Sequence, residues 1–417
     1  MEIRGIRVWD GERDRGVAAV RWRGDRIEDV AAWDEDRHPG LSLIPGLIDT
    51  HVHLVSYAGP DAVDYLTWPL VTPQVEQVLH GVAHALRALR VGVTTVRDLA
   101  ADRSQVAIRH AFDQGVLLGP RVVAHGLVGM TAGHGDLFTP PDVIDRPPTA
   151  DGPDACRRLV REYARMGADG IKVTTSGGVL SAGDRNEWRN YTRAELEAIV
   201  DEAHALAMPV AAHAHTRAGI QAALDVGVDS LEHATQITPA QAREAARRGV
   251  TVAPTLLILE RIARGDTAVP EASRAKAQAL FAARGEALRR AAAEGVEFVL
   301  GTDASGRHMP FGMQLDEVRA MARDLDLGDE GALVAATSRA ARAVGMADRV
   351  GRVASGFHPD FVVVRGRPWQ RIEDLTPANV VAVVARGQVV VGRVADDGTV
   401  VAGDPPEAAP ATLGMWT

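Results

Sequence analysis

Histidine and aspartate side chains end several apolar runs in this sequence, and their arrangement indicates metal chemistry. His51 and His53 end the run LIPGLIDTHVHL, and His213, His233 and Asp303 end later runs. Residues i and i+2 of a strand point to the same face, so His51 and His53 can bind one ion together. A single buried histidine is usually a hydrogen-bonded core residue. A convergent group of histidines and an aspartate instead predicts a Zn²⁺ site, with Fe, Mn, Co and Ni as competing ions.

Lysine is scarce in this chain, which makes the two lysines informative. Of the 46 basic residues, only Lys172 and Lys276 are lysine, and the other 44 are arginine. Arginine stays protonated at any useful pH, whereas a desolvated lysine can lose its proton and react. Lys172 lies in the apolar run GIKVTTSG, which predicts a buried strand and a chemical role. Lys276 lies in a helical pattern, where we expect an ordinary surface side chain.

Three further histidines are weaker candidates for a role in the site. His134 stands in the segment TAGHGD, where a donor to the transition state and a structural role are equally compatible with the residues. His215 follows His213 by two residues and therefore shares its strand face. His308 comes shortly after Asp303 and either lines a pocket or lies on an exposed loop.

The elements that must position these residues are short apolar strands, each followed by a helical stretch rich in Ala, Leu, Arg and Glu. We count eight such units, with strands near 43–54, 93–100, 121–128, 170–177, 209–215, 229–234, 250–256 and 297–305. Apolar strands with little alternation, separated by helices, are typical of a parallel sheet with crossover helices. Eight units predict an α/β fold of the (β/α)₈ TIM-barrel type, whose active sites form at the C-terminal ends of the strands.

The chain ends and the long connections carry further expectations. Strand-like runs fill the first forty-odd residues and return at the end, so we expect residues 1–45 and 350–417 to form a composite β-sandwich. Residues 46–349 would then form the barrel. The connections after strands three, four and seven are long, which in a barrel usually means that they are functional. In the second of them, Arg185, Arg189 and Tyr191 could clamp a substrate carboxylate, although a solvated face is the favoured interpretation.

The composition limits the partners. The chain is 46% hydrophobic and 24% charged, as in globular proteins, and its net charge of −9 argues against nucleic acid. No apolar run reaches the roughly 20 residues that span a bilayer, and the charged N-terminus has no signal-peptide core. The single cysteine, Cys156, fits a reducing compartment and a packing role. We therefore expect a cytoplasmic protein without membrane partners, and leave open whether it forms a homo-oligomer.

These motifs resemble those of the amidohydrolase superfamily over almost the whole chain. The matching segments run from PGLIDTHVHL through GVTTVRDL, GADGIKVTTSGG, PVAAHAH, GVDSLEHA and GTDAS to ASGFHPDFVVV. The similarity is greatest to the imidazolonepropionase-like and Xaa-Pro dipeptidase-like branch. It implies a hydrolase of carbon–nitrogen bonds with two divalent ions, zinc first among them. The ligands that it implies are His51, His53 and Asp303 for the more buried ion, His213 and His233 for the more exposed ion, and N6-carboxylated Lys172 as the bridge.

The carbamate on Lys172 has a physical rationale. It turns an amine into an anionic ligand with two oxygens, as a bridged metal pair needs. A free lysine has a pKa of about 10.4, so burial and nearby cations must favour the neutral, reactive amine. Two ions about 3.5–4 Å apart can share a hydroxide, and they lower the pKa of its parent water from 15.7 to near 7.

The resemblance also suggests how protons move. Asp303 is the candidate shuttle, which accepts a proton as water attacks and delivers it to the leaving amine. His134 resembles a transition-state donor of the relatives. His215 stands where many dipeptidase-like relatives carry tyrosine, and it could donate to the carbonyl oxygen in its place.

The leading hypothesis is hydrolysis of an amide or peptide bond in a dipeptide, an N-acyl amino acid or a peptide-derived natural product. A cyclic amide, a carbamate or a urea is the alternative substrate class. A mononuclear deaminase fits less well, because such relatives lack the bridging lysine. A catalytically silent barrel used for binding or assembly is the alternative from another class, and it fits poorly because every ligand position is filled.

Overall fold

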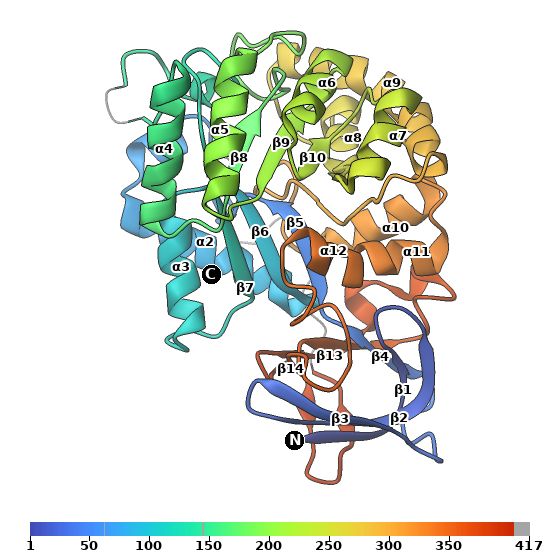
Figure 1. Ribbon diagram of the computed structural model, residues 1–417. Helices are drawn as coiled ribbons and strands as arrows, with labels where there is room; N and C mark the ends of the chain where they lie inside the picture. Colours follow the sequence, from blue (N-terminus) through green and yellow to red (C-terminus); the bar gives the residue numbers. More distant parts are fainter. Residues whose placement is uncertain (62, 144–145, 404–417) are drawn as a thin grey trace.

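The computed structural model describes residues 1–61, 63–143 and 146–403, and the predicted barrel forms its larger part (Figure 1). Seven parallel strands follow one another in the sheet in the order β11-β10-β9-β8-β7-β6-β5. They are β5 (Leu47–Val52), β6 (Val93–Ala101), β7 (Arg121–Leu127), β8 (Gly170–Thr174), β9 (Val210–Ala214), β10 (Ser230–His233) and β11 (Thr251–Ala253). All seven fall within or beside the predicted segments.

Residues 297–304 close the barrel as its eighth strand. They form isolated parallel bridges to β11 on one side and to β5 on the other. The N–H of Asp303 donates to the carbonyl of His51 at 2.8 Å, so the end of the eighth strand is joined to the end of the first. The (β/α)₈ prediction is therefore confirmed.

Helices cover the outside of the barrel (Figure 1). The main ones are α2 (Gln74–Arg90), α3 (Arg103–Asp113), α4 (Pro153–Met166), α5 (Arg193–Ala205), α6 (Arg217–Val226), α7 (Pro239–Arg248), α8 (Leu256–Arg264), α9 (Glu271–Ala293), α10 (Gln314–Asp324), α11 (Gly328–Ala335) and α12 (Ser338–Ala343). Short helices occur in loops: α1 (Trp68–Val71), η1 (Asp136–Phe138), η2 (Ile372–Asp374) and η3 (Pro377–Asn379). Of the helices described, none combines the length and the apolar character that crossing a membrane requires.

The two ends of the chain form a second sheet, sheet A, with the strand order β14-β13-β12-β4-β1-β2-β3. Its strands are β1 (Glu2–Trp9), β2 (Asp14–Arg23), β3 (Arg26–Ala32), β4 (Leu41–Pro45), β12 (Phe361–Arg365), β13 (Val380–Ala385) and β14 (Gln388–Val391). A small hairpin of β15 (Arg393–Val394) and β16 (Val400–Val401) follows. Residues 404–417 of the predicted second segment lie outside the described residues.

Sheet A curls around its own apolar core. Trp22 of β2 meets Phe361 of β12 with ring centroids 5.1 Å apart, although β4 and β1 lie between these strands in the sheet. Neighbouring strands are about 4.8 Å apart, so a flat sheet could not bring these rings together. Arg121, which begins β7, bonds Asp360 beside β12 at 2.9 Å. Sheet A therefore adjoins the N-terminal end of the barrel strand β7.

One predicted strand is two strands in the structure. The run 43–54 divides at Gly46 into β4, which belongs to sheet A, and β5, which belongs to the barrel. A Cβ atom at Gly46 would lie 2.1 Å from the hydroxyl oxygen of Thr94 on β6. The glycine lets the backbone pass close to β6 as it leaves one sheet for the other, and an apolar pattern alone does not reveal such a step.

Candidate metal centre

The structure brings the predicted residues of the first and last barrel strands together. Asp303 Oδ1 lies 3.1 Å from His53 Nε2 and 3.5 Å from His51 Nε2. His233 of β10 joins them, with its ring centroid 5.2 Å from that of His51. His51, His233 and Asp303 each offer a ligand atom, and these atoms lie within 4.8 Å of one another. This spacing suits a shared cation.

A second group of possible ligands overlaps the first. His213, His215 and His233 offer ring nitrogens that lie within 4.8 Å of one another. The ring centroids of His213 and His233 are 4.6 Å apart. Because His233 belongs to both groups, the two possible cation positions are neighbours.

The backbone at these strand ends is in an unfavourable conformation. His233 and Asp303 have φ angles of +69° and +57°, and Ala234 and Thr255 have +47° and +46°. Residues with a side chain rarely adopt left-handed backbone, which costs on the order of 1–3 kcal/mol per residue and is concentrated at functional sites. The strands thus end in turns at the residues that form the cluster.

Three of the four ligand-candidate histidines have a polar neighbour at one ring nitrogen. His51 Nδ1 lies 2.9 Å from Glu232 Oε2, His233 Nδ1 lies 2.6 Å from the Thr255 hydroxyl, and His213 Nε2 lies 3.2 Å from the carbonyl oxygen of Gly177. Metal-binding histidines typically use one nitrogen as the ligand and bond the other to a carboxylate, carbonyl or water. The donor set therefore fits a metal site.

Sequence reasoning missed Glu232. Its carboxylate is fully buried between His51 and Arg97, whose Nη2 lies 2.9 Å from Glu232 Oε1. Burial alone would raise the pKa of Glu232, but the charge of Arg97 and the contact with His51 hold it well below its usual range. The ionised carboxylate can fix the tautomer and orientation of the His51 ring. The available signal was an acidic residue directly before the candidate ligand His233 in the short strand SLEH.

Lys172 lies on β8, and its side chain is buried inside the barrel. Burial lowers its pKa to about 8, although the carboxylates of Glu232 and Asp303 act in the opposite direction. A lysine with such a pKa is partly neutral near physiological pH, and the neutral amine is the form that reacts with an electrophile.

Burial keeps most of the imidazoles neutral, which is the form that binds metals. It lowers the pKa of His51 to about 4 and the pKa values of His213 and His233 well below the usual range. His53 differs: burial lowers its pKa, but the hydrogen bond and charge of Asp303 together with the charge of Asp98 more than offset burial, so the pKa is raised. Burial would raise the pKa of Asp303, but attraction to His51 and His53 lowers it to about 2, so this carboxylate is ionised.

His134 and His215 both lie against the cluster. The His134 ring stacks on that of His213 at a centroid distance of 4.3 Å, and its Nδ1 lies 2.8 Å from the Ser181 hydroxyl. The His215 ring stacks on that of His233 at 4.4 Å, and its Nδ1 lies 2.8 Å from the Thr235 hydroxyl. In each ring the other nitrogen is left for a ligand or donor role.

Three other side chains considered in the sequence analysis are buried in the structure. His308 is buried, with Nδ1 3.0 Å from the Thr267 hydroxyl and its ring against Tyr65, so its placement on an exposed loop is excluded. Tyr191 is buried too, and its hydroxyl donates to the carbonyl of Val128, so the idea that it clamps a substrate is wrong. Cys156 is buried on α4, in agreement with a packing role.

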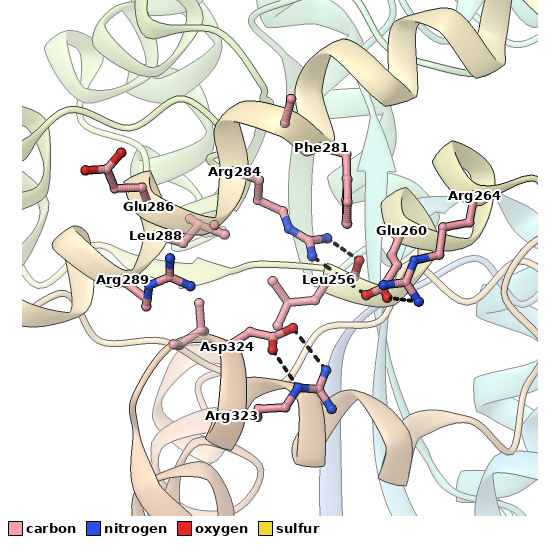
Figure 2. Close-up of a pocket in the computed structure, with 13 residues that line it drawn as sticks. Leu256, Glu260, Arg264, Phe281, Arg284, Glu286, Leu288, Arg289, Arg323 and Asp324 are labelled. Atoms are coloured by element: carbon pink, nitrogen blue, oxygen red, sulfur yellow. Dashed lines mark hydrogen bonds and ion pairs between the residues drawn. The ribbon is translucent and has the colours of Figure 1, made fainter.

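A cavity of about 700 Å³ lies away from this cluster, between α8, α9 and α10 (Figure 2). Its lining combines the apolar Leu256 and Phe281 with Arg284, Glu260 and Arg323, and it includes none of the candidate ligands. The Arg284 guanidinium donates to the carbonyl of Leu256 across it. The candidate site is thus defined by its converging ligand atoms and not by this cavity.

Comparison with known proteins agrees with this geometry. The model of the amidohydrolase family matches residues 42–390 of the chain. The protein belongs to this family. A similar protein is the ochratoxinase of Aspergillus niger, 32% identical over 398 residues that cover 90% of this chain and 80% of that one.

Solved structures of the same fold include a dipeptidase and a prolidase. One is a Xaa-Pro dipeptidase with bound methionine in its active site, 28% identical, which covers 93% of this chain and 98% of its own with a TM-score of 0.84. Another is a prolidase complexed with N-methylphosphonate-L-proline, 29% identical with a TM-score of 0.83 and the same coverage of both chains. This amidohydrolase is a hydrolase of carbon–nitrogen bonds, as expected from the sequence.

Proposed function

We propose that this amidohydrolase uses two divalent ions, zinc first among them, to hydrolyse the amide bond of a dipeptide, an N-acyl amino acid or a peptide-derived natural product. The observation that carries the proposal is the pair of ligand groups that overlap at His233, together with buried Lys172, which is near enough for Asp303 and Glu232 to affect its pKa. The similarity to a Xaa-Pro dipeptidase and a prolidase supports a substrate with an amide next to an amino-acid residue.

The residues that would hold the ions are assigned as the family resemblance implies, and this division differs from the two groups at His53 and His215. His51, His53 and Asp303 would bind one ion, and His213 and His233 the other. Lys172 would bridge them as a carbamate: its neutral amine attacks CO₂, a C–N bond forms, and one proton leaves. Arginine at this position could not do so, because it does not lose its proton.

The ions would lower the pKa of the attacking water and polarise the scissile carbonyl. Asp303 is ionised and hydrogen-bonded to His53, so it can accept a proton. As the water oxygen bonds to the carbonyl carbon, one water proton passes to Asp303. Asp303 then gives this proton to the nitrogen as the carbon–nitrogen bond breaks, which releases an amine and a carboxylic acid.

His134 and His215 would stabilise the negative charge that develops on the carbonyl oxygen. Both rings are stacked on candidate ligands, and each is held at Nδ1 by a hydroxyl group. Fixed donors of this kind act without reorganisation in the transition state, where removing one typically costs about 10²–10³ in kcat.

A substrate comparison tests this function. The zinc-loaded protein is assayed for amine release from a panel of dipeptides and N-acyl amino acids, beside cyclic amides, carbamates and ureas of similar size. We expect turnover of at least one member of the first set, and loss of that turnover in Asp303→Asn. Turnover confined to the second set would contradict the substrate class. No turnover of any compound by metal-loaded protein would favour a silent barrel.

A further inference from the structure

The second lysine of the chain, Lys276, makes specific contacts that the sequence did not suggest. It lies on α9, and its Nζ donates to the carbonyls of Gly178 at 2.6 Å, Ser181 at 3.2 Å and Asp184 at 3.2 Å. All three carbonyls belong to the loop that follows β8. The expectation of an ordinary surface side chain is therefore wrong. An ammonium group offers three hydrogen-bond donors, and here all three have acceptors.

The same loop residues hold the ring of His134. The Ser181 hydroxyl lies 2.8 Å from His134 Nδ1 and donates to Asp184 Oδ2 at 2.5 Å. Asp184 Oδ2 also accepts the N–H of Gly178 at 2.7 Å and lies 3.3 Å from His134 Nδ1. The backbone that Lys276 binds therefore carries the side chains that orient His134.

The loop has no free space against this ring. A Cβ atom at Gly178 would lie 2.1 Å from His134 Cε1, and one at Gly177 would lie 2.0 Å from the carbonyl oxygen of Arg185. Gly178 lets the backbone lie directly on the imidazole, and Gly177 lets the loop pack closely on itself. Any displacement of the loop must therefore displace His134 or open a gap beside it.

The helix that carries Lys276 is itself fixed to the barrel. Further along α9, the Arg284 guanidinium donates to the carbonyl of Leu256, the first residue of α8 (Figure 2). The buried carboxylate of Glu317 accepts the N–H of the same Leu256 at 2.5 Å. Lys276 thus extends from an anchored helix and connects the loop to a rigid part of the fold.

We propose that Lys276 is a positioning residue that fixes the loop 177–185 and, through Ser181 and Asp184, holds His134 in place at the candidate metal centre. The catalytic consequence rests on the function proposed above, whereas the effect on the loop does not. Arginine cannot replace lysine here, because a planar guanidinium fork does not match three carbonyls that converge on one point. This requirement explains why a chain that otherwise uses arginine retains lysine at this position.

Hydrogen exchange tests the loop without reference to catalysis. The variants are Lys276→Met and Lys276→Arg. The matched control is Arg290→Met, which removes an exposed partner of Glu286 from the same helix. We expect amide exchange in 177–185 to rise about tenfold or more in both Lys276 variants, because the loop loses charge-assisted hydrogen bonds, and to stay unchanged in the control. Wild-type exchange of the loop in both Lys276 variants would overturn the proposal.

Amide exchange within α9 of the Lys276→Met variant is the internal control that reveals unfolding. We expect exchange within α9 to stay as in the wild type. If α9 also exchanges faster in Lys276→Met, the Lys276→Arg variant decides, because it keeps the charge and approximate length of the side chain. Fast exchange of the loop 177–185 in Lys276→Arg, with α9 still protected, supports the proposal. Wild-type protection of the loop in Lys276→Arg overturns it.

Kinetics test the link to His134. With an amide substrate of the wild type, we expect Lys276→Met to lower kcat roughly 10–100-fold with a smaller change in KM, as for other residues that orient a catalytic group. The kcat of the double variant Lys276→Met/Asp184→Asn should be no lower than that of Asp184→Asn alone, because both substitutions act on His134 through the same loop. Additive losses would overturn the path through Asp184. If the wild type cleaves no amide, the proposed function fails, while the exchange result still decides the role of Lys276 in the loop.

Discussion

The histidine cluster at the C-terminal ends of the barrel strands, here called the barrel mouth, and the core of sheet A both lie inside the protein. The barrel mouth consists of polar side chains and the core of sheet A of apolar ones. Sheet A packs aromatic and branched apolar residues such as Trp22 and Phe361 around one centre. The barrel mouth packs imidazoles against the carboxylate of Asp303. Burial stabilises the core of sheet A by removing apolar surface from water, whereas it penalises the barrel mouth unless every polar group has a partner.

The backbone differs in the same sense. At the barrel mouth His233, Ala234, Thr255 and Asp303 have positive φ angles, whereas among the strands of sheet A such a residue occurs at Arg386, in the turn between β13 and β14. We infer that the backbone conformation at the barrel mouth lowers the free energy of unfolding in order to place the candidate ligands. Bound ions would recover part of that stability, because ligands that bind only the folded state stabilise it. Substitutions in the two regions should therefore have separable effects.

The largest effect on activity is expected at Asp303. Asp303→Asn keeps the size of the side chain and tolerates the left-handed backbone, since asparagine is favoured there. It removes the proton acceptor, so kcat should fall by about 10²–10⁴. Steady-state kinetics on a cleaved amide provide the measurement, with the melting temperature as a control for folding. A kcat close to that of the wild type would show that another group moves the proton.

A smaller effect, on metal affinity, is expected when the carboxylate of Glu232 beside His51 is removed. Glu232→Gln leaves His51 without its anionic neighbour, and loss of such a partner typically weakens metal binding about 10–100-fold. Competition with a chromogenic chelator measures this affinity. Glu244→Gln is the matched control, because Glu244 pairs with Arg248 on the surface helix α7. Equal affinities in the two variants would argue that Glu232 serves the fold alone.

The rate of zinc uptake by metal-free protein is expected to change about tenfold with pH. Burial lowers the pKa of Lys172 to about 8, so its neutral fraction rises roughly tenfold between pH 7 and pH 9. If the neutral amine forms a carbamate, zinc uptake by metal-free protein should accelerate over this range, and only when bicarbonate is present. Stopped-flow uptake with and without bicarbonate tests the dependence. A rate independent of bicarbonate at every pH would oppose carbamate formation.

The smallest effect on activity is expected in sheet A. Trp22→Ala removes a fully buried aromatic side chain that packs on Phe361, and such truncations cost about 3–5 kcal/mol of folding free energy. Denaturant unfolding should show this loss, while metal content and kcat at 25 °C stay as in the wild type. A change in metal content of the folded variant would mean that the two regions are coupled.

The barrel could be predicted from the sequence, and so could the convergence of histidine and aspartate side chains at the ends of its strands. Parallel strands of a closed barrel end on one face, so side chains at eight strand ends must converge whatever the details of the loops. The roles of Glu232 and Lys276 could not be predicted in this way. Glu232 is defined by contacts with residues on β5 and β6, and Lys276 by a loop that is distant in sequence. Local patterns do not record such contacts.

Metal content is the most direct test of the central claim that Lys172 bridges two ions. Wild-type protein and Lys172→Arg are produced in zinc-supplemented medium and analysed by plasma emission, with circular dichroism to verify folding. The account predicts about two equivalents of metal in the wild type and a clear loss in folded Lys172→Arg. Two equivalents in both proteins would remove lysine as the bridge, and one or none in the wild type would contradict the two-ion site itself.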